Sequence, residues 1–282
     1  EGYNAGNKYG DTTHGLIAAF LSCEVKLLVG TELSEVHTLL DGYIQLAKAY
    51  NKNGLLALAC PLHQRVLNLM GRNEHPNVLT GSAMNQEELL IELEHCDNEV
   101  SYVNVLNHVF LINCMFENWD NAYRYYREIH KRPEALKTLD TTFSIRQYQF
   151  FYGLFCSAWH QRTGSKKHKK TAHRILNLMK QQQSSGCPNY DCFIPILDAE
   201  LSTYSKTARK DEVHAAYWRA VDSCKYVHLR GIAHERAASV LQASPFCDRF
   251  LAKEHLQAAK RQYTQWQAQA KVKDVEQKLK YL

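Results

Sequence analysis

Two short runs have residue types that could support chemistry, and each lacks part of the motif it would need. Residues 163–166 read Thr-Gly-Ser-Lys. A phosphate-binding loop needs an earlier glycine, a lysine followed by serine or threonine, and a preceding strand, whereas this run follows a predicted helix. His234–Glu235–Arg236 begins like the phosphoacceptor box of a histidine kinase but continues with Ala-Ala-Ser rather than Thr-Pro. We interpret the first run as a turn between helices and the second as part of a helix, and we predict no catalytic residue.

Nine cysteines are spread along the chain, and no pair has the Cys-x-x-Cys spacing of a zinc or redox site. Most lie in apolar stretches, where a free cysteine behaves as a small hydrophobic residue. This usage predicts a reducing, intracellular compartment, and we expect the cytoplasm. Cys187 and Cys192, with His168 and His173 upstream, could be read as metal ligands, but a structural loop beside a solvated basic helix is the favoured interpretation. We expect no metal and no cofactor.

Composition indicates a folded protein, because 45% of the 282 residues are hydrophobic and 22% are charged. Thirteen glycines and six prolines leave few breaks, which favours long helices. The net charge of +5 is mild, suits a protein partner or an acidic surface equally well, and is too weak by itself to argue for nucleic acid, which is not the expected partner. No secretory signal and no apolar run of about 18 residues is present. Since the chain starts at Glu1 and ends on Tyr281–Leu282, we expect it to belong to a longer or processed protein.

Apolar residues recur at helical spacing along the chain, as Leu16, Phe20, Cys23 and Leu27 do within residues 12–28. A loop rich in Gly, Asn and Pro is expected at 71–82. Connections elsewhere are short, so neighbouring helices should be antiparallel, and the predicted class is all-α. Further helices are expected at about 36–50, 55–70, 83–94, 98–116, 119–131, 142–162, 166–185, 190–206, 210–229, 231–243, 247–266 and 268–281.

Small residues alternate with large ones at three- and four-residue spacing, as helix hairpins of the tetratricopeptide type require. We therefore predict a right-handed α-solenoid of antiparallel helix pairs, divergent and tetratricopeptide-like, because no clean 34-residue period is present. One continuous domain over 1–282 is expected, and a division at the loop into 1–70 and 83–282 is the alternative. The predicted structural repeat positions are Trp119, Ala122, Ala216, Ala220, Ala252, Ala259 and Trp266.

Two surface features could serve binding. The first is a basic cluster, which is most simply the solvated start of a helix and alternatively a contact for an acidic partner domain, a lipid headgroup or RNA phosphates. The second is a set of tyrosines, which we expect mainly to line the core and the grooves between helices. The more specific alternative is that they belong to a concave face that binds a peptide. The basic cluster is a candidate interaction patch made of Arg162, Lys166, Lys167, Lys169, Lys170 and Arg174. The tyrosines are Tyr123, Tyr125, Tyr126, Tyr148 and Tyr152.

Several segments together resemble one protein family. Residues 186–189 read Gly-Cys-Pro-Asn and residues 197–201 read Leu-Asp-Ala-Glu-Leu, similar to the G-x-P-N and L-x-A-E-L of that family. Residues 235–237 match its E-R-A element, and residues 263–272 resemble its Y-x-x-W-G-A-x-A-K-V, with Gln267 in place of glycine. The resemblance is to the helical region of large multidomain signalling ATPases, which join a serine/threonine-kinase-like domain, a STAND/AAA-type ATPase, tetratricopeptide-like helices, and GAF with histidine-kinase or cyclase domains.

The resemblance covers only the helical region, so it carries over no kinase, ATPase or output chemistry. It implies a protein-interaction or scaffold module that acts as the sensor or coupling arm of such an ATPase. It also implies a continuous helix or a non-glycine turn at Gln267. A standalone helical adaptor within a larger complex is the alternative, and an RNA-binding solenoid is the third interpretation. The expected partner is a protein or a flanking domain, with no transmembrane segment.

Overall fold

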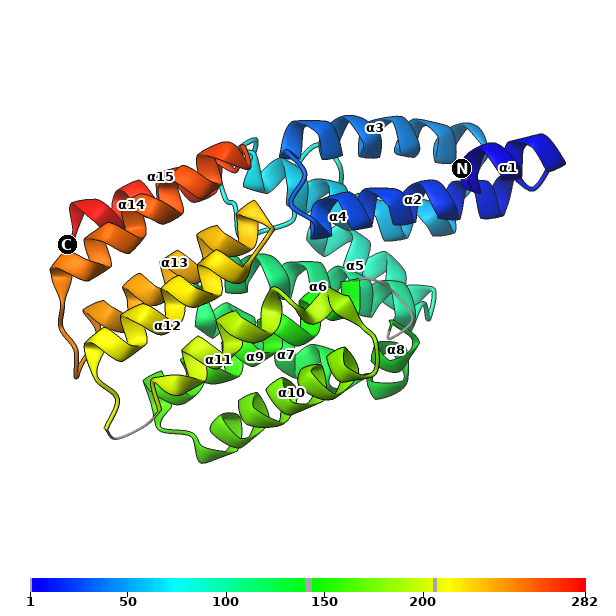
Figure 1. The fold of residues 1–282 in the computed structure, drawn as a ribbon. Helices are drawn as coiled ribbons and strands as arrows, with labels where there is room; N and C mark the ends of the chain where they lie inside the picture. Colours follow the sequence, from blue (N-terminus) through cyan, green and yellow to red (C-terminus); the bar gives the residue numbers. More distant parts are fainter. Residues whose placement is uncertain (1, 140–143, 205–206) are drawn as a thin grey trace. The chain divides into compact units, whose positions relative to one another are not determined.

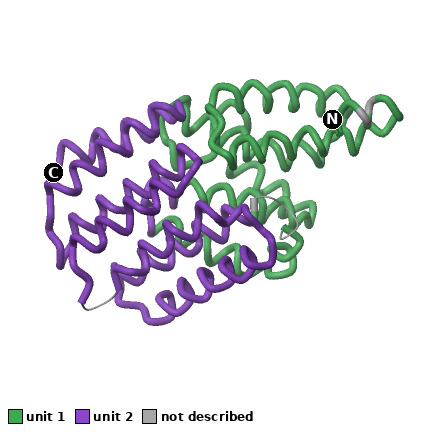
Figure 2. Tube along the Cα trace, in the orientation of Figure 1, with its two compact units in different colours: residues 1–113, 120–145 green, residues 114–119, 146–282 purple. Residues whose placement is uncertain are grey.

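The computed structural model describes residues 2–139, 144–204 and 207–282, and every regular element in those ranges is a helix (Figure 1). The prediction of an all-α fold, built from successively packed helices as in an α-solenoid, is confirmed. The chain forms two compact units (Figure 2). Unit 1 comprises residues 1–113 and 120–145, and unit 2 comprises residues 114–119 and 146–282. The predicted 71–82 loop lies within unit 1.

Unit 1 begins with helices that each pack against the next, joined by short turns, with Leu16, Leu40 and Val66 among the buried apolar residues. The last residues of its sixth helix and the first residue of its seventh belong to unit 2. The elements are α1 (Gly2–Tyr9), α2 (Thr12–Leu28), α3 (Leu33–Ala49), α4 (Asn53–Leu69), α5 (Gln86–His95), α6 (Glu99–Met115), α7 (Trp119–Ile129) and α8 (Pro133–Thr138).

Unit 2 continues the pattern, since each helix from α10 to α14 packs against the next helix in the chain. Its interior is rich in buried aromatic side chains, among them Phe155, Phe193, Tyr217, Tyr263 and Trp266. The elements are α9 (Ser144–Thr163), α10 (Lys166–Ser184), the short 3-10 helix η2 (Pro188–Tyr190), α11 (Phe193–Ser202), α12 (Lys210–Ser223), α13 (Val227–Gln242), α14 (Arg249–Gln265) and α15 (Gln269–Lys280).

Two buried amide side chains of α4 hold the loop between α4 and α5. Asn68 donates to the carbonyl oxygens of Pro76 and Val78 at 3.0 and 2.7 Å. Gln64 accepts from the backbone N–H of Ala83 at 2.9 Å and donates to Asn68 at 2.7 Å. These bonds satisfy loop backbone groups that have no helical partner, so the long connection is ordered by α4.

The structure departs from the expected helices at several places, among them the expected helix 190–206, whose α-helical part is Phe193–Ser202. The predicted helix 210–229 ends at Ser223, because Cys224 adopts an extended backbone (φ −89°, ψ 125°), and the next helix starts at Val227. Helices α1 and α8 were not predicted: α1 contains two glycines, and α8 has six residues, too few to show a period. The predicted starts and ends at 142–143 and 205–206 lie outside the described residues.

The α14–α15 corner is a turn formed without glycine. Gln267 takes a φ of 64°, in the left-handed region, and Ala268 N–H bonds back to the Tyr263 carbonyl at 2.9 Å. This is the hydrogen-bond pattern of a Schellman C-cap, which usually places glycine at that position. Of the two geometries expected at Gln267, the structure therefore has the non-glycine turn.

Candidate functional site

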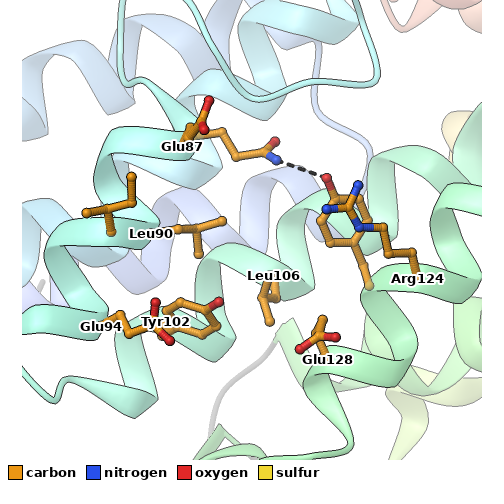
Figure 3. Close-up of a pocket in the computed structure, with 10 residues that line it drawn as sticks. Glu87, Leu90, Glu94, Tyr102, Leu106, Arg124 and Glu128 are labelled. Atoms are coloured by element: carbon orange, nitrogen blue, oxygen red, sulfur yellow. Dashed lines mark hydrogen bonds between the residues drawn. The ribbon is translucent and has the colours of Figure 1, made fainter.

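A groove of about 470 Å³ opens on unit 1 where side chains of α5, α6 and α7 converge. Figure 3 shows Glu87, Leu90 and Glu94 along α5, facing Tyr102 and Leu106 of α6. Arg124 and Glu128 of α7 form another wall, and Gln86 donates to the Tyr125 hydroxyl across the groove at 3.1 Å (Figure 3). The helical period places residues 87, 90, 91 and 94 on one face of α5, which explains why a single short helix supplies so much of the lining.

Arg132, which follows α7, contacts several of the side chains that line this groove. Its guanidinium lies 4.2 Å from the centre of the Tyr102 ring, a cation–π contact that fixes the aromatic wall. It also lies within 4.0 Å of Glu94, 3.7 Å of Glu99 and 3.9 Å of Glu128. One half-buried cation thus connects α5, α6 and α7 and holds two groove glutamates in place.

The groove combines apolar surface with carboxylates. Its lining includes three glutamates, Glu87, Glu94 and Glu128, and one cation, Arg124. Arg132 and Lys131 lie outside the lining and contact Glu94 and Glu128. Ile91 is 49% exposed there, which leaves apolar surface open to a ligand. A hydrogen bond from Lys131 lowers the pKa of Glu128, so this carboxylate is charged at neutral pH. The groove can therefore receive an apolar side chain next to a cationic one.

A second groove of about 470 Å³ lies on unit 2 between α11 and α12. Small side chains line most of it, including Ala199, Ser202 and Ala216. Asp198 and Arg219 supply one charge of each sign. Its walls offer less aromatic surface and no excess charge, so it is the less selective of the two grooves.

The largest cluster of ionised side chains is buried inside unit 2. Arg236 of α13 makes two bonds to Glu200 of α11, Nη2 to Oε1 at 2.7 Å and Nε to Oε2 at 3.2 Å, and it also pairs with Glu117. Tyr217 and Ser157 donate to the same Glu200 carboxylate at 2.6 and 3.0 Å. The side chains of Arg236, Tyr217 and Ser157 thus all donate to this one buried carboxylate.

A second half of the cluster is formed around Glu235. Lys271 and Lys278 of α15 contact Glu235 at 2.8 and 2.6 Å, and Tyr263 donates to it at 2.7 Å. Lys278 also reaches Glu117 at 2.8 Å, which joins the two halves. Burial alone would raise the pKa of Glu117, but the charges of Lys278 and Arg236 outweigh it and lower that pKa. Because these charges pair with one another, we interpret the cluster as a structural feature that holds the helices of unit 2 against one another.

Three of the four segments quoted for the family resemblance contribute residues to this ion cluster. Residues 197–201 supply Glu200, residues 235–237 supply Glu235 and Arg236, and residues 263–272 supply Tyr263 and Lys271. The burial of these separated polar residues in one cluster was not predicted from the sequence. A polar residue inside an otherwise apolar helical stripe is the signal that could have found them.

Three histidines form a chain across α12, α13 and α14. His255 contacts His214 through Nε2 at 3.1 Å and His234 through Nδ1 at 2.9 Å. Burial lowers the pKa of His255 to about 3 and that of His234 to about 4. Since His255 directs its two nitrogens to different partners, the rings do not converge on one point. Among the described residues, no group of three or more His, Cys, Asp or Glu could hold a metal ion.

The candidate patch predicted from the sequence lies at the end of α9 and the start of α10, and it is largely exposed. Lys169 is half-buried, with its ammonium 5.1 Å from the centre of the Tyr204 ring. Arg162 lies 5.6 Å from the Trp159 ring centre. The other members, Lys166, Lys167, Lys170 and Arg174, are exposed. None of the patch lines the groove on unit 1.

The predicted repeat positions are buried with one exception. The half-buried Ala216 lines the α11–α12 groove, whereas the others lie in the interior: Trp119, Ala122, Ala220, Ala252, Ala259 and Trp266. Among the tyrosines, Tyr125 lines the groove on unit 1, and Tyr148 is buried with its ring stacked 5.7 Å from that of Tyr152. The groove on unit 1 was not predicted from the sequence, because its residues come from three helices.

Within the described part of the chain, no helix is both long and apolar enough to cross a membrane. Comparison with models of known protein families and with curated protein sequences gave no match.

Proposed function

We propose that this chain is a protein-interaction module whose groove on unit 1 binds a peptide segment carrying a lysine or arginine next to an apolar residue. The observation that carries the proposal is the groove itself, with exposed Ile91, the Tyr102 wall and three glutamates against one arginine. Its volume lies within the range of sites that accept a few side chains. Apolar contact would supply affinity, and the glutamates would select the cation.

Selection of peptides on the intact chain tests this proposal. Peptides displayed on phage, selected and then labelled with fluorescein, should be enriched in Lys or Arg beside Leu, Ile or Phe. Glu94→Lys should weaken binding of the selected peptide about fivefold in fluorescence anisotropy, since one exposed ion pair becomes a repulsion. Glu92→Lys is the matched control, because Glu92 is exposed on the same helix but does not line the groove. Enrichment of acidic peptides, or equal weakening by both variants, would contradict the proposal.

The resemblance described above supports a more specific role, in which the module is the sensor or coupling arm of a multidomain signalling ATPase. A standalone adaptor in a larger complex is the alternative. The mass of the native protein separates them, measured by immunoblot of fresh cell extract with an antibody to this segment. A band well above the 32.5 kDa of this chain would support the coupling arm, and a band near that mass would support the adaptor. The free cysteines favour a reducing, cytoplasmic location for either form.

The exposed basic patch favours a second candidate function, binding to an anionic polymer such as RNA. The first turn of α10 contains Lys166 and Lys167 and no acidic residue. Cations at a helix N-terminus oppose the helix dipole, and a bound anion would offset that cost. Affinity for polyuridylate should then fall steeply between about 50 and 200 mM salt. Binding that is weak and does not depend on salt would exclude this function.

A further inference from the structure

Cys192 and Cys224 are distant in sequence but lie together in unit 2. Cys192 immediately precedes α11, and Cys224 immediately follows α12, so the packed antiparallel helices bring both to the same end of the pair. The Lys225 N–H donates to the Cys192 sulfur at 3.4 Å. The Cys224 thiol has one proton and two acceptors in reach, the Tyr226 carbonyl at 3.6 Å and the Cys192 sulfur.

The surroundings of Cys192 stabilise a thiolate. The hydrogen bond from the Cys224 thiol, which outweighs burial, acts with the backbone N–H groups of Lys225 and Tyr226 to lower the pKa of Cys192 to about 6. Burial has the opposite effect elsewhere and raises the pKa of Cys156 to about 12. Reactive cysteines are those whose thiolate is stabilised, whereas cysteines buried in apolar surroundings are inert.

The pair lies just beneath the surface. Cys192 and Cys224 are 4% and 5% exposed, but their sequence neighbours Asp191 and Lys225 are exposed. Both cysteines are at helix ends, where the backbone opens more easily than inside a helix. Small reagents such as hydrogen peroxide can therefore reach the sulfurs when these helix ends open.

We propose that Cys192 and Cys224 form an oxidation site at which a hydroperoxide converts the two thiols reversibly into a disulfide. The Cys192 thiolate attacks one oxygen of hydrogen peroxide, the O–O bond breaks, and hydroxide leaves, giving a sulfenic acid. Cys224 loses its proton to that hydroxide, and its sulfur attacks the Cys192 sulfur. The S–O bond breaks, hydroxide leaves and takes up a proton. The two sulfurs lose two electrons, and one peroxide becomes two waters. A dithiol reductant converts the disulfide back into two thiols by thiol–disulfide exchange and is itself oxidised to a disulfide.

The disulfide would tie the start of α11 to the end of α12. The groove between these helices is lined near that end by Pro195 and Ser223. A covalent bond there prevents the two helices from separating at this end and so limits how far the groove can open. Oxidation would in this way modify the second groove and leave the groove on unit 1 unchanged, so the inference is independent of the proposed function.

Peptide mapping of the intact, fully reduced chain tests the proposal. The chain is treated with one equivalent of hydrogen peroxide, alkylated with iodoacetamide and digested with trypsin and an Asp-specific protease, which separates Cys187 from Cys192. We expect a cross-linked peptide containing Cys192 and Cys224, about 2 Da lighter than the sum of the two reduced peptides and lost on addition of dithiothreitol. The exposed Cys96 and Cys247 should remain mostly alkylated and serve as internal controls.

Cys224→Ser provides a second measurement. Without the second thiol, Cys192 should stop at the sulfenic acid and be trapped by dimedone, while circular dichroism shows that the variant is folded. Full alkylation of Cys192 and Cys224 at peroxide levels that oxidise Cys96 would overturn the proposal. A disulfide between Cys192 and Cys187 instead of Cys224 would overturn it as well. Peptide mapping of the wild-type chain tests the proposal even if the Cys224→Ser variant does not fold.

Discussion

Arg236 shows how a single buried charge can support several helices. Its guanidinium bonds to Glu200 of α11 and to Glu117 in the turn before α7, and it lies 5.2 Å from the Trp119 ring centre. The two carboxylates outweigh burial and raise its pKa well above the usual value, so it is a fixed cation. Buried ion pairs contribute little net stability, yet removal of one partner is costly because the other charge remains without compensation.

Arg236→Met is therefore expected to lower the free energy of unfolding by about 3–5 kcal/mol. The methionine fills part of the space but leaves Glu200 and Glu117 without their shared cation. Urea unfolding followed by circular dichroism measures the effect. Arg219→Met, on the exposed face of α12, is the control and should change stability by less than about 0.5 kcal/mol. Equal midpoints for both variants would contradict the account.

The histidine chain predicts loss of stability in mild acid. His255 and His234 have folded-state pKa values of about 3 and 4, below the value of about 6.5 for an unfolded histidine. As pH falls below about 6.5, the unfolded chain binds protons that the folded chain does not bind. Stability is thus fully present above pH 6.5 and declines by up to about 1.4 kcal/mol per pH unit for each such group until the folded-state pKa is reached.

His255→Leu should flatten this decline, because it removes one of the groups. Chemical denaturation at a series of pH values between 7 and 4.5 gives the slope for wild type and variant. His75→Gln, at an exposed loop position, is the control and should leave the slope unchanged. A slope for His255→Leu equal to that of wild type would mean that the buried histidines do not control acid stability.

At the scale of the element, Gly231 permits the close approach of α13 and α14. A Cβ at this position would lie 2.7 Å from the Tyr263 ring, and Tyr263 is held in place by its bond to Glu235. Gly231→Ala should therefore destabilise the protein by about 1–3 kcal/mol, although alanine is the better helix former. Gly42→Ala, in α3 with open space around it, should instead stabilise by about 0.5–1 kcal/mol. Thermal melting should show a lower Tm for Gly231→Ala and a higher Tm for Gly42→Ala. A shift of Tm in the same direction for both variants would contradict the packing explanation.

The α14–α15 corner predicts a stabilising substitution. Gln267 is held in the left-handed region at φ 64°, where a side chain costs about 1 kcal/mol and glycine avoids that cost. After the greater flexibility of glycine in the unfolded chain is allowed for, Gln267→Gly should raise stability by about 0.5 kcal/mol. Denaturant unfolding gives the difference. A loss of stability would show that Gln267 contributes more through its side chain than its backbone conformation costs.

At the scale of the whole molecule, the last helix maintains the charge balance of unit 2. Lys271 and Lys278 belong to α15, and with Trp266 they lie beyond residue 265. A chain truncated after Gln265 would keep Glu117 and Glu235 but lose the lysines that neutralise them. We expect lower solubility and a lower, broader melting transition. Hydrogen exchange should also increase at residues 114–119, and an unchanged melting profile would count against the role given to α15.

Local sequence pattern was sufficient for most elements. The apolar spacing in residues 12–28 predicted α2 at its observed bounds, because an amphipathic stripe fixes a helix whatever it packs against. The junction between the helices expected at 210–229 and 231–243 was wrong, because the helices lie at Lys210–Ser223 and Val227–Gln242. The extended backbone at Cys224 and the contact of Gly231 with Tyr263 depend on residues far away in the chain, so the local pattern did not indicate them.

The sequence by itself determined the class of fold, the positions of most helices, and the exposure of the basic patch, since all of these follow from periodicity and charge within single segments. Only the tertiary structure decided which polar residues are buried together. The groove on unit 1 joins side chains from three helices, the ion cluster joins Glu117 to Lys278, and Cys192 meets Cys224. The reason is physical: side-chain pairing across helices depends on the packing of one helix on another, which the pattern within each helix does not specify.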